Sequence, residues 1–355
     1  LLLQQGLLRN RAPFSFLHAF LCFTLMPSPR FVHLRFHSEY SITDGIVRID
    51  PMIHAVLEGG GAAVGISDLM NVFGGLRFYT HALAAGLKPI LGCDLKVINP
   101  KDLNKPFRLG VLCMNHEGYH SLSVLLTKAF LTNNDAARGL VDPKWFDDGG
   151  SEGLIALSGA AQGELGSLLL GKKWALAHEA AERFKAQFPG RFYVELQRAG
   201  RPTDELATAR LANFAVEEQL PVVATHPIQF LKPEDFEAHE VRCSIAEGYT
   251  LQDPRRVKRY TPEQYLKSEA EMCELFADIP AAIENTVEIA KRCNLDGVLS
   301  KPQLPLFPTP DGMSLDDYID QLSKEGLQKR LEFLYPDPKV LEERRPPYDK
   351  RLEYE

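Results

Sequence analysis

The patterned part of the chain opens with a short apolar strand that leads into a dense group of polar residues: Arg30-Phe-Val-His-Leu-Arg-Phe-His-Ser-Glu-Tyr-Ser-Ile-Thr-Asp-Gly45. The apolar pattern of Phe31–Arg35 is typical of a β-strand. His33 and Arg35 are two residues apart and should therefore share one face of that strand. We expect this strand to be the first in a repeating series of strands and helices.

Short apolar strands alternate with helical stretches up to about residue 230. The predicted strands are Phe31–Arg35, Ala62–Ser67, Pro89–Val97, Leu109–Met114, Gly153–Ser158, Arg191–Leu196 and Leu220–Thr225. The predicted helices between them are Pro51–Glu58, Gly74–Ala85, Tyr119–Ala129, Lys173–Gln187 and Thr203–Gln219. Helical crossovers indicate an α/β fold with a parallel sheet, and seven strands favour a closed or nearly closed (β/α) barrel over an open, doubly wound sheet. No Gly-rich phosphate fingerprint follows any strand, which argues against a nucleotide-binding Rossmann unit or a P-loop.

Functional residues of a (β/α) barrel gather at the carboxyl ends of its strands. In this sequence those ends carry polar residues, among them His37, Asp44, Asp68 and Asp94, together with the run Thr225–Gln229. A metal-dependent hydrolase needs several neutral imidazoles and carboxylates around each ion. The strand ends offer few histidines and include two cations, so they do not form a good metal site.

Charge and cysteine content exclude several classes of protein. The 355 residues are enough for two domains, and 40 Lys+Arg against 47 Asp+Glu give a net charge of -7. A free-standing DNA-binding domain is usually basic, so we expect most of this surface not to touch a duplex. No two of the six cysteines are separated by only two residues. This spacing argues against a structural zinc site and favours a reduced chain in the cytoplasm.

The first 25 residues do not share the pattern of the rest. Arg9 and Arg11 precede an apolar stretch, Phe14–Leu25, that superficially resembles a secretory signal. The stretch is too short to span a bilayer, and no Ala-x-Ala-like cleavage site follows it. The first methionine is Met26. We therefore interpret residues 1–25 as a non-native upstream extension.

The pattern changes after residue 230. Three further helices with capping signals are predicted, at Asp235–Ala246, Pro262–Phe276 and Pro280–Cys293. The second is expected to start with Thr261 as its N-cap and Pro262 as its first residue. Ser300–Pro310 has four prolines in eleven residues, which indicates an extended linker. A helix at Ser314–Phe333 then begins a new unit, and the chain looks truncated at Glu355.

Several runs resemble bacterial DNA polymerase III alpha subunits, in the order of that family. The first is the opening stretch, residues 30–45. The others are Lys88-Pro-Ile-Leu-Gly92, Asn115-His-Glu-Gly-Tyr119, Gly153-Leu-Ile-Ala-Leu-Ser-Gly159, Leu220-Pro-Val-Val-Ala-Thr225, Glu271-Met-Cys-Glu-Leu-Phe-Ala-Asp278 and Asn285-Thr-Val-Glu-Ile-Ala290. Each run alone is weak evidence, but so many in register make the resemblance specific, and it covers nearly everything from Met26 onward.

The resemblance implies a polymerase-and-histidinol-phosphatase (PHP) domain, which is a distorted seven-stranded (β/α) barrel. It implies the following organisation: an extension at 1–25, the PHP domain at 26–297, a Pro-rich linker at 298–313, and the start of the polymerase palm at 314–355. The whole parent protein would be a DNA-directed DNA polymerase that uses Mg²⁺ and acts with other replicase subunits. The three palm aspartates of the family lie beyond this sequence, so the fragment itself is expected to be inactive and to contain no catalytic residue.

Metal-binding relatives in the PHP family hold their ions with nine residues, mostly His with some carboxylates and one Cys. On this sequence His37 and Asp44 match that pattern. The other seven positions carry different residues. Three histidines are replaced by Arg35, by Leu69 after Asp68 and by Arg108, while Asp94 replaces a Glu and Ala160 replaces the Cys. After His226, Pro227 replaces the final Asp and Gln229 replaces the final His. We therefore expect no metal or other cofactor in this fragment, with His37, Asp44 and Asp94 as the remaining candidate ligands.

Arginine at a ligand position is informative because a guanidinium has no lone pair to donate. We expect Arg35 to pair with an acidic residue that remains from this ligand set, such as Asp44 or Asp94. A buried carboxylate without a compensating charge would lower the stability of the fold. The same cations could instead bind a phosphate or an acidic side chain. His37 with Asp44 is interpreted as a hydrogen-bonded scaffold pair rather than a metal pair. The basic run Arg255–Arg259 is interpreted as a solvated loop, with contact to DNA as the alternative.

The resemblance leaves more than one role open. The first is a metal-free scaffold on which a separate proofreading exonuclease docks. The second is an active metal-dependent phosphoesterase or 3′–5′ exonuclease. The replacement of most metal-binding residues argues against this role. The third is the error-prone form of the same polymerase family, although the His37–Ser41 run favours the replicative form.

Overall fold

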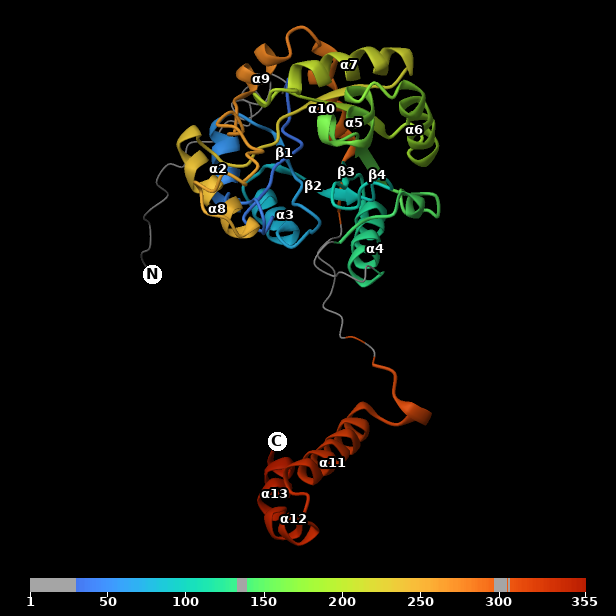
Figure 1. The fold of residues 1–355 in the computed structure, drawn as a ribbon, viewed down its shortest axis with the longest axis vertical. Coiled ribbons are helices and arrows are strands. Elements are labelled where there is room, and N and C mark those ends of the chain that lie inside the picture. The colour runs from blue at the N-terminus through green and yellow to red at the C-terminus, as the bar shows by residue number, and fades with distance from the viewer. Residues whose placement is uncertain (1–29, 133–138, 297–304, 306) are drawn as a thin grey trace, which may run out of the picture. The chain divides into compact units, whose positions relative to one another are not determined.

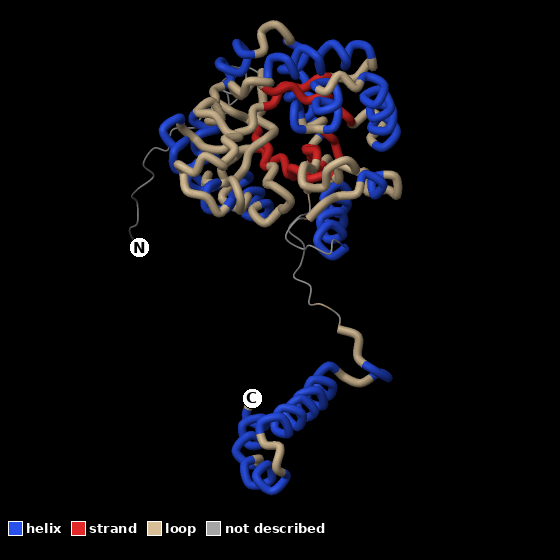
Figure 2. Tube along the Cα trace, in the orientation of Figure 1, coloured by secondary structure: helices blue, strands red, loops and turns tan. Residues whose placement is uncertain are grey.

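A computed structural model describes residues 30–132, 139–296, 305 and 307–355. The chain divides into two compact units, Leu1–Val298 and Leu299–Glu355. The first unit is built on one six-stranded sheet, with the strands in sequence order and helices around them (Figure 2). Its strands are β1 (Ala63–Ile66), β2 (Lys88–Val97), β3 (Phe107–Cys113), β4 (Leu154–Leu157), β5 (Phe192–Gln197) and β6 (Val222–Thr225).

The sheet is mixed, whereas the sequence predicted a parallel one. β1 and β2, β4 and β5, and β5 and β6 pair in parallel, but β3 is antiparallel to both β2 and β4. The connection between β2 and β3 is only residues 98–106, which contain turns and no helix. A parallel pair needs a crossover of a dozen or more residues, so this short loop can only join antiparallel strands.

The expected first strand, Phe31–Arg35, does not form a regular strand, so the seven-stranded barrel is not reproduced as such. Instead, isolated bridges join His33 to Val64 of β1, and Phe36 to Ile228 just after β6. Because successive bridges go to different neighbours, no continuous ladder can form. The segment nevertheless connects the two edges of the sheet, and Phe36 is fully buried there.

Helices cover the sheet (Figure 1). Those of the first unit are α2 (Ile49–Glu58), α3 (Gly75–Ala84), α4 (His116–Thr132), α5 (Glu164–Leu170), α6 (Trp174–Gln187), α7 (Asp204–Glu217), α8 (Phe236–Glu247), α9 (Glu269–Leu275) and α10 (Pro280–Arg292). α3 packs on β2, α4 on β3, α7 on β5 and α10 on β6. Phe78, Phe146, Phe188 and Phe214 are fully buried in the core between these layers. The apolar periodicity therefore placed most helices correctly, although α5 was not predicted.

The helix predicted at Pro262–Phe276 begins seven residues late, at Glu269. Ser268 forms a capping box with Glu271, which fixes the start of α9. Residues before Ser268 have other partners: the amide of Leu266 donates to the carbonyl of Phe230, and Tyr265 bridges Phe230. Because these residues are paired in an extended conformation, the helix that was predicted to start at Thr261 and Pro262 does not form there.

The second unit contains α11 (Leu315–Leu334), α12 (Pro338–Arg344) and α13 (Pro346–Tyr354). The hydroxyl of Ser314 accepts from the amide of Asp317 and caps α11 close to its predicted start. The expected extension at 1–25 and most of the Pro-rich stretch Ser300–Pro310 lie outside the described residues. Among the helices that are described, none is both long and apolar enough to cross a membrane.

Candidate functional site

Residues from the strand ends of the first unit converge on one small cavity of about 60 Å³. Its lining combines cations, carboxylates and amides from segments that are far apart in the sequence. The lining residues are Arg35, His37, Asp44, Asp94, Arg108, Gly159, Gln162, Gln197, Arg201, Pro227, Gln229, Arg259 and Tyr260. The structure therefore brings together seven of the residues that were singled out from the sequence: Arg35, His37, Asp44, Asp94, Arg108, Pro227 and Gln229.

Arg35 is the centre of this cluster and is only 5% exposed. Its Nη2 lies 2.5 Å from Oδ2 of Asp94, and its Nη1 donates to both carboxylate oxygens of Glu195, at 3.2 and 3.1 Å. Gly110, opposite Asp94 on β3, leaves room for the guanidinium, because a Cβ there would lie 3.2 Å from Nη1. Of the two acids expected to pair with Arg35, the structure gives it Asp94 and not Asp44. It adds Glu195, which was not considered.

Asp94 receives positive charge from three sides. Besides Arg35, Nη1 of Arg108 lies 3.3 Å and Nε2 of His37 lies 3.5 Å from its Oδ2. Burial alone would raise the pKa of the Asp94 carboxyl, but the charges of Arg35 and Arg108 and the contact with His37 hold that pKa well below its usual range. Asp94 is therefore a buried carboxylate that stays ionised because cations surround it.

His37 and Asp44 form a second buried pair. Nδ1 of His37 lies 3.1 Å from Oδ2 of Asp44, whose oxygens also accept from the hydroxyls of Ser41 at 2.5 Å and Tyr260 at 3.1 Å. Burial would lower the pKa of His37, but the charge and hydrogen bond of Asp44 and the contact with Asp94 raise it to about 9. Burial would raise the pKa of Asp44, but His37 and Ser41 hold it well below its usual range. The pair is therefore an imidazolium and a carboxylate at neutral pH.

This pair should make the stability of the protein depend on alkaline pH. The folded chain holds the His37 proton up to about pH 9, whereas the unfolded chain releases it near 6.5. The contribution is thus complete below pH 6.5 and is lost as the pH rises to 9, which amounts to about 3 kcal/mol. Denaturant unfolding at pH 6.5, 7.5 and 9 measures this loss. His37→Gln should flatten the profile over that range, and a variant with the same slope as the unmodified chain would contradict the assignment.

Four of the residues singled out from the sequence do not line the cavity. Both carboxylate oxygens of Asp68 accept from Ser38, at 2.6 and 2.7 Å, and burial raises the pKa of Asp68 to about 6. Leu69 contacts the cluster through its backbone, by a bridge to Asp94 and by its amide, which donates to the hydroxyl of Ser41 at 3.1 Å. Ala160 is buried in the turn after β4 with a positive φ of 47°. His226, the fourth, is turned to another part of the molecule.

His226 and His33 are buried histidines that bind backbone carbonyls. Nε2 of His226 donates to the carbonyl of Glu263 at 2.8 Å, and Nε2 of His33 donates to that of Lys267 at 2.7 Å. Burial lowers the pKa of His226 to about 3 and that of His33 to about 4. Both imidazoles are therefore neutral at physiological pH, and they hold residues 263–267 against the sheet.

The donor set of the cavity does not suit a divalent ion. Across the part of the chain that the structure describes, no three His, Cys, Asp or Glu side chains are grouped so that they could hold a metal. Two guanidiniums already contact the Asp94 oxygen, and they carry no lone pairs. The charges also balance without an ion, since Arg35, Arg108 and protonated His37 face Asp44, Asp94 and Glu195. A divalent cation would add two uncompensated positive charges.

Several residues of the site were not identified from the sequence. Glu195 lies in the middle of β5, where an acid between Val194 and Leu196 in an apolar strand was a usable signal. Its carboxylate also accepts from the amide of Gly159 at 2.9 Å and from the hydroxyl of Thr225 at 2.5 Å. Arg201, Arg259 and Tyr260 come from irregular segments, and nothing in their local pattern pointed to this cavity.

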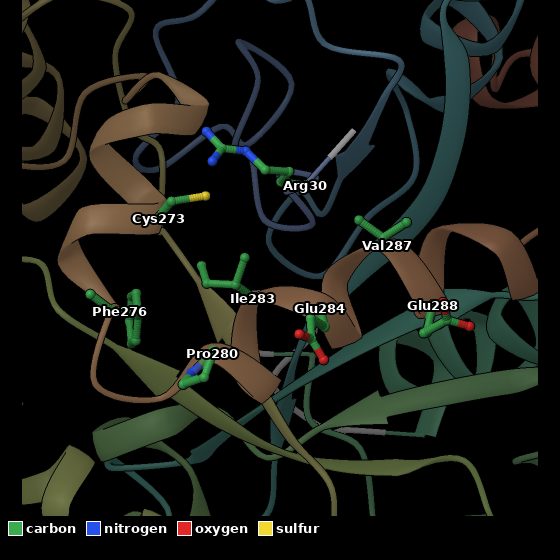
Figure 3. Close-up of a pocket in the computed structure, with 9 residues that line it drawn as sticks. Arg30, Cys273, Phe276, Pro280, Ile283, Glu284, Val287 and Glu288 are labelled. Carbon is green, nitrogen blue, oxygen red and sulfur yellow. The ribbon is translucent and has the colours of Figure 1, made fainter. Parts of the chain in front are cut away.

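A different hollow, of about 430 Å³, lies between α9 and α10 (Figure 3). Its lining is mainly apolar and includes Phe276, Pro280 and Ile283, with Cys273 and Arg30 at one side. The Arg30 guanidinium is engaged by Glu269, with Nε 3.0 Å from Oε1. The hollow lacks a group of converging titratable side chains, so we place the candidate site in the cavity around Arg35.

The sequence comparisons point to one family. The model of the PHP domain matches residues 33–199. The DNA polymerase III subunit alpha of Neisseria meningitidis serogroup B is 48% identical over 332 residues, which cover 93% of this chain and 29% of that protein. The corresponding subunit of Escherichia coli K12 is 44% identical over 330 residues, covering 93% of this chain and 28% of that protein. An amidohydrolase structure from Chromobacterium violaceum aligns with a TM-score of 0.38 at 12% identity, over 56% of this chain and 87% of that one. The chain thus spans less than a third of the length of these curated relatives.

Proposed function

Because the chain belongs to the family of bacterial DNA polymerase III alpha subunits and contains a PHP domain, we propose that it is the N-terminal part of a DNA-directed DNA polymerase that replicates the chromosome in the bacterial cytoplasm. In that protein the nucleotidyl transfer with Mg²⁺ would be carried out by a palm that begins near residues 314–355. The fragment itself would not polymerise DNA. Its PHP domain would hold no metal and would act as a structural scaffold.

The observation that carries the scaffold role is the charge-balanced cluster around Arg35. Two buried cations, Arg35 and His37, and the partly buried Arg108 neutralise three buried carboxylates at the place where metal-binding relatives of the family hold their ions. Ion pairs thereby take over the cohesive role that metal–carboxylate bonds have elsewhere. The cluster ties together the segment 31–38, β2, β3 and β5, so its function is to hold the fold together.

The partners of such a scaffold would be other replicase subunits, and first a separate proofreading exonuclease. The resemblance supports this choice, because in lineages of the family that lost the metal site a separate proofreading exonuclease docks on the PHP domain. Size-exclusion chromatography of the chain mixed with the exonuclease subunit tests the idea. A stoichiometric complex is expected, and separate elution at micromolar concentrations would contradict docking while leaving the scaffold role intact.

The alternative is an active metal-dependent PHP enzyme, either a phosphoesterase or a 3′–5′ exonuclease, and calorimetry decides between the two. Mn²⁺ and Zn²⁺ are titrated into the chain after treatment with a chelator and desalting. We expect no saturable heat from either ion. Stoichiometric, tight binding would overturn the metal-free scaffold and bring the phosphoesterase forward.

A further inference from the structure

The hollow of about 430 Å³ between α9 and α10 is an apolar surface that takes no part in the cluster around Arg35. Buried Phe276 and Ile283 line it together with half-buried Cys273 and Val287 (Figure 3). Its volume is within the range of about 300–1,000 Å³ that is usual for binding clefts. Such a surface is stabilised when apolar side chains of another segment remove it from water.

The rim of the hollow is acidic. Glu284 and Glu288 of α10 line it. Arg30 also lines it, but its Nε lies 3.0 Å from Oε1 of Glu269. Glu288 contacts Lys291 at 2.7 Å, whereas Glu284 forms no ion pair with any residue that the structure describes. The rim therefore favours an apolar segment that carries positive charge.

The chain before Arg30 has the complementary composition. Residues 1–29 include Arg9 and Arg11 but no Asp or Glu, and nine of the twelve residues of Phe14–Leu25 are apolar. An apolar stretch of this kind is stabilised by burial against an apolar surface. Charge and hydropathy thus match it to this hollow and not to the basic cavity around Arg35.

The distance along the chain permits this contact. Arg30 lines the hollow, and only residues 26–29 separate it from Leu25. Five residues span at most about 18 Å, so the apolar stretch can reach the hollow directly. A short covalent connection also gives an effective concentration on the order of millimolar, which a separate partner would have to match.

We propose that apolar residues of Phe14–Leu25 bind in the hollow between α9 and α10 of the same chain, with Arg9 and Arg11 toward Glu284 and Glu288. The bound segment then closes the hollow to other proteins. The sequence alone suggested that residues 1–25 are a non-native extension, and here that extension is a ligand of the domain that follows it. The inference is independent of the proposed function, because it involves neither a metal nor the cluster at the strand ends.

Alkylation of Cys273 by iodoacetamide, followed by peptide mass spectrometry, tests the proposal. Among the cysteines that the structure describes, only Cys273 is not buried, so its rate reports whether the hollow is covered. The full chain is compared with a variant that begins at Met26. We expect Cys273 to react at least about tenfold more slowly in the full chain, because the segment must leave before the reagent enters. Buried Cys93 and Cys113 should stay unreactive in both, which verifies that both chains are folded.

Glu284→Lys tests the charge at the rim without shortening the chain. It should weaken the protection of Cys273 by the segment at least about threefold, because a lysine there repels a basic segment. Glu274→Lys is the matched control, since Glu274 is exposed on α9 beside Cys273 but does not line the hollow. It should change the alkylation rate by the same factor in the full and the shortened chain.

Three outcomes would overturn the proposal. Equal alkylation rates in the full and the shortened chain would mean that the segment does not cover the hollow. Slow alkylation in both would mean that another surface, such as that of a second copy, covers it. Protection that increases with protein concentration would place the segment in the hollow of a second copy, whereas binding within one chain gives a rate ratio that is independent of concentration.

Discussion

Replacing Arg35 by alanine is expected to lower the free energy of unfolding by about 4 kcal/mol. The substitution leaves Asp94 and Glu195 buried, at 3% and 0% exposure, without the guanidinium that lies between them. Asp94 retains Arg108 and His37 as cationic contacts, but the remaining hydrogen-bond donors to Glu195 are all neutral. Removal of one partner from a buried ion pair is costly because the other charge stays buried.

A thermal melt measures this effect, and a surface ion pair provides the control. For a domain of this size, the loss corresponds to a fall in melting temperature of roughly 10 °C. Arg77→Ala removes an arginine of the same chain that lies 2.9 Å from Asp50, but that pair is almost half exposed, and the expected loss is below about 1 kcal/mol. Similar melting temperatures for the two variants would show that the cluster does not hold the domain together.

The fold was largely predictable because its elements carry local patterns. Six of seven strands and most helices follow from apolar runs and periodicity, which are properties of neighbouring residues. The wrong predictions concern segments whose structure depends on contacts with residues far away in the sequence. Phe31–Arg35 is shared between β1 and the end of β6 and so does not form a ladder, and residues 264–266 pair with Gln229 and Phe230 instead of starting a helix.

Residues of the site could be predicted from the sequence only where they stand at a position that binds metal in relatives of the PHP family. That comparison pointed to Arg35, His37, Asp44 and Asp94, all of which the structure places in the cluster. It could not find Glu195, because this acid contacts Arg35 and stands at none of the positions that were compared. Nor could it place Arg201 or Tyr260, which reach the cavity from irregular segments whose path depends on tertiary packing.

Glu195→Ala is expected to destabilise the chain about as much as Arg35→Ala, by about 4 kcal/mol. The carboxylate neutralises Arg35 and accepts three hydrogen bonds from neutral donors, namely the amide of Gly159, the side-chain amide of Gln197 and the hydroxyl of Thr225. Its removal leaves that amide without an acceptor and opens a void in a fully buried place. Denaturant unfolding measures the loss. Glu205→Ala is the control, because Glu205 is 75% exposed and contacts Arg198 at the surface, so its loss should stay below about 1 kcal/mol.

The double variant, Arg35→Ala with Glu195→Ala, distinguishes charge pairing from simple loss of packing. If the two side chains stabilise the fold through their mutual charge, the second substitution removes an uncompensated ion that the first one created. The double variant should then be less destabilised than the sum of the single variants, by about 2 kcal/mol. Strict additivity would mean that each residue acts through its own packing and neutral hydrogen bonds. In that case the mutual attraction of Arg35 and Glu195 would not be what stabilises this cluster.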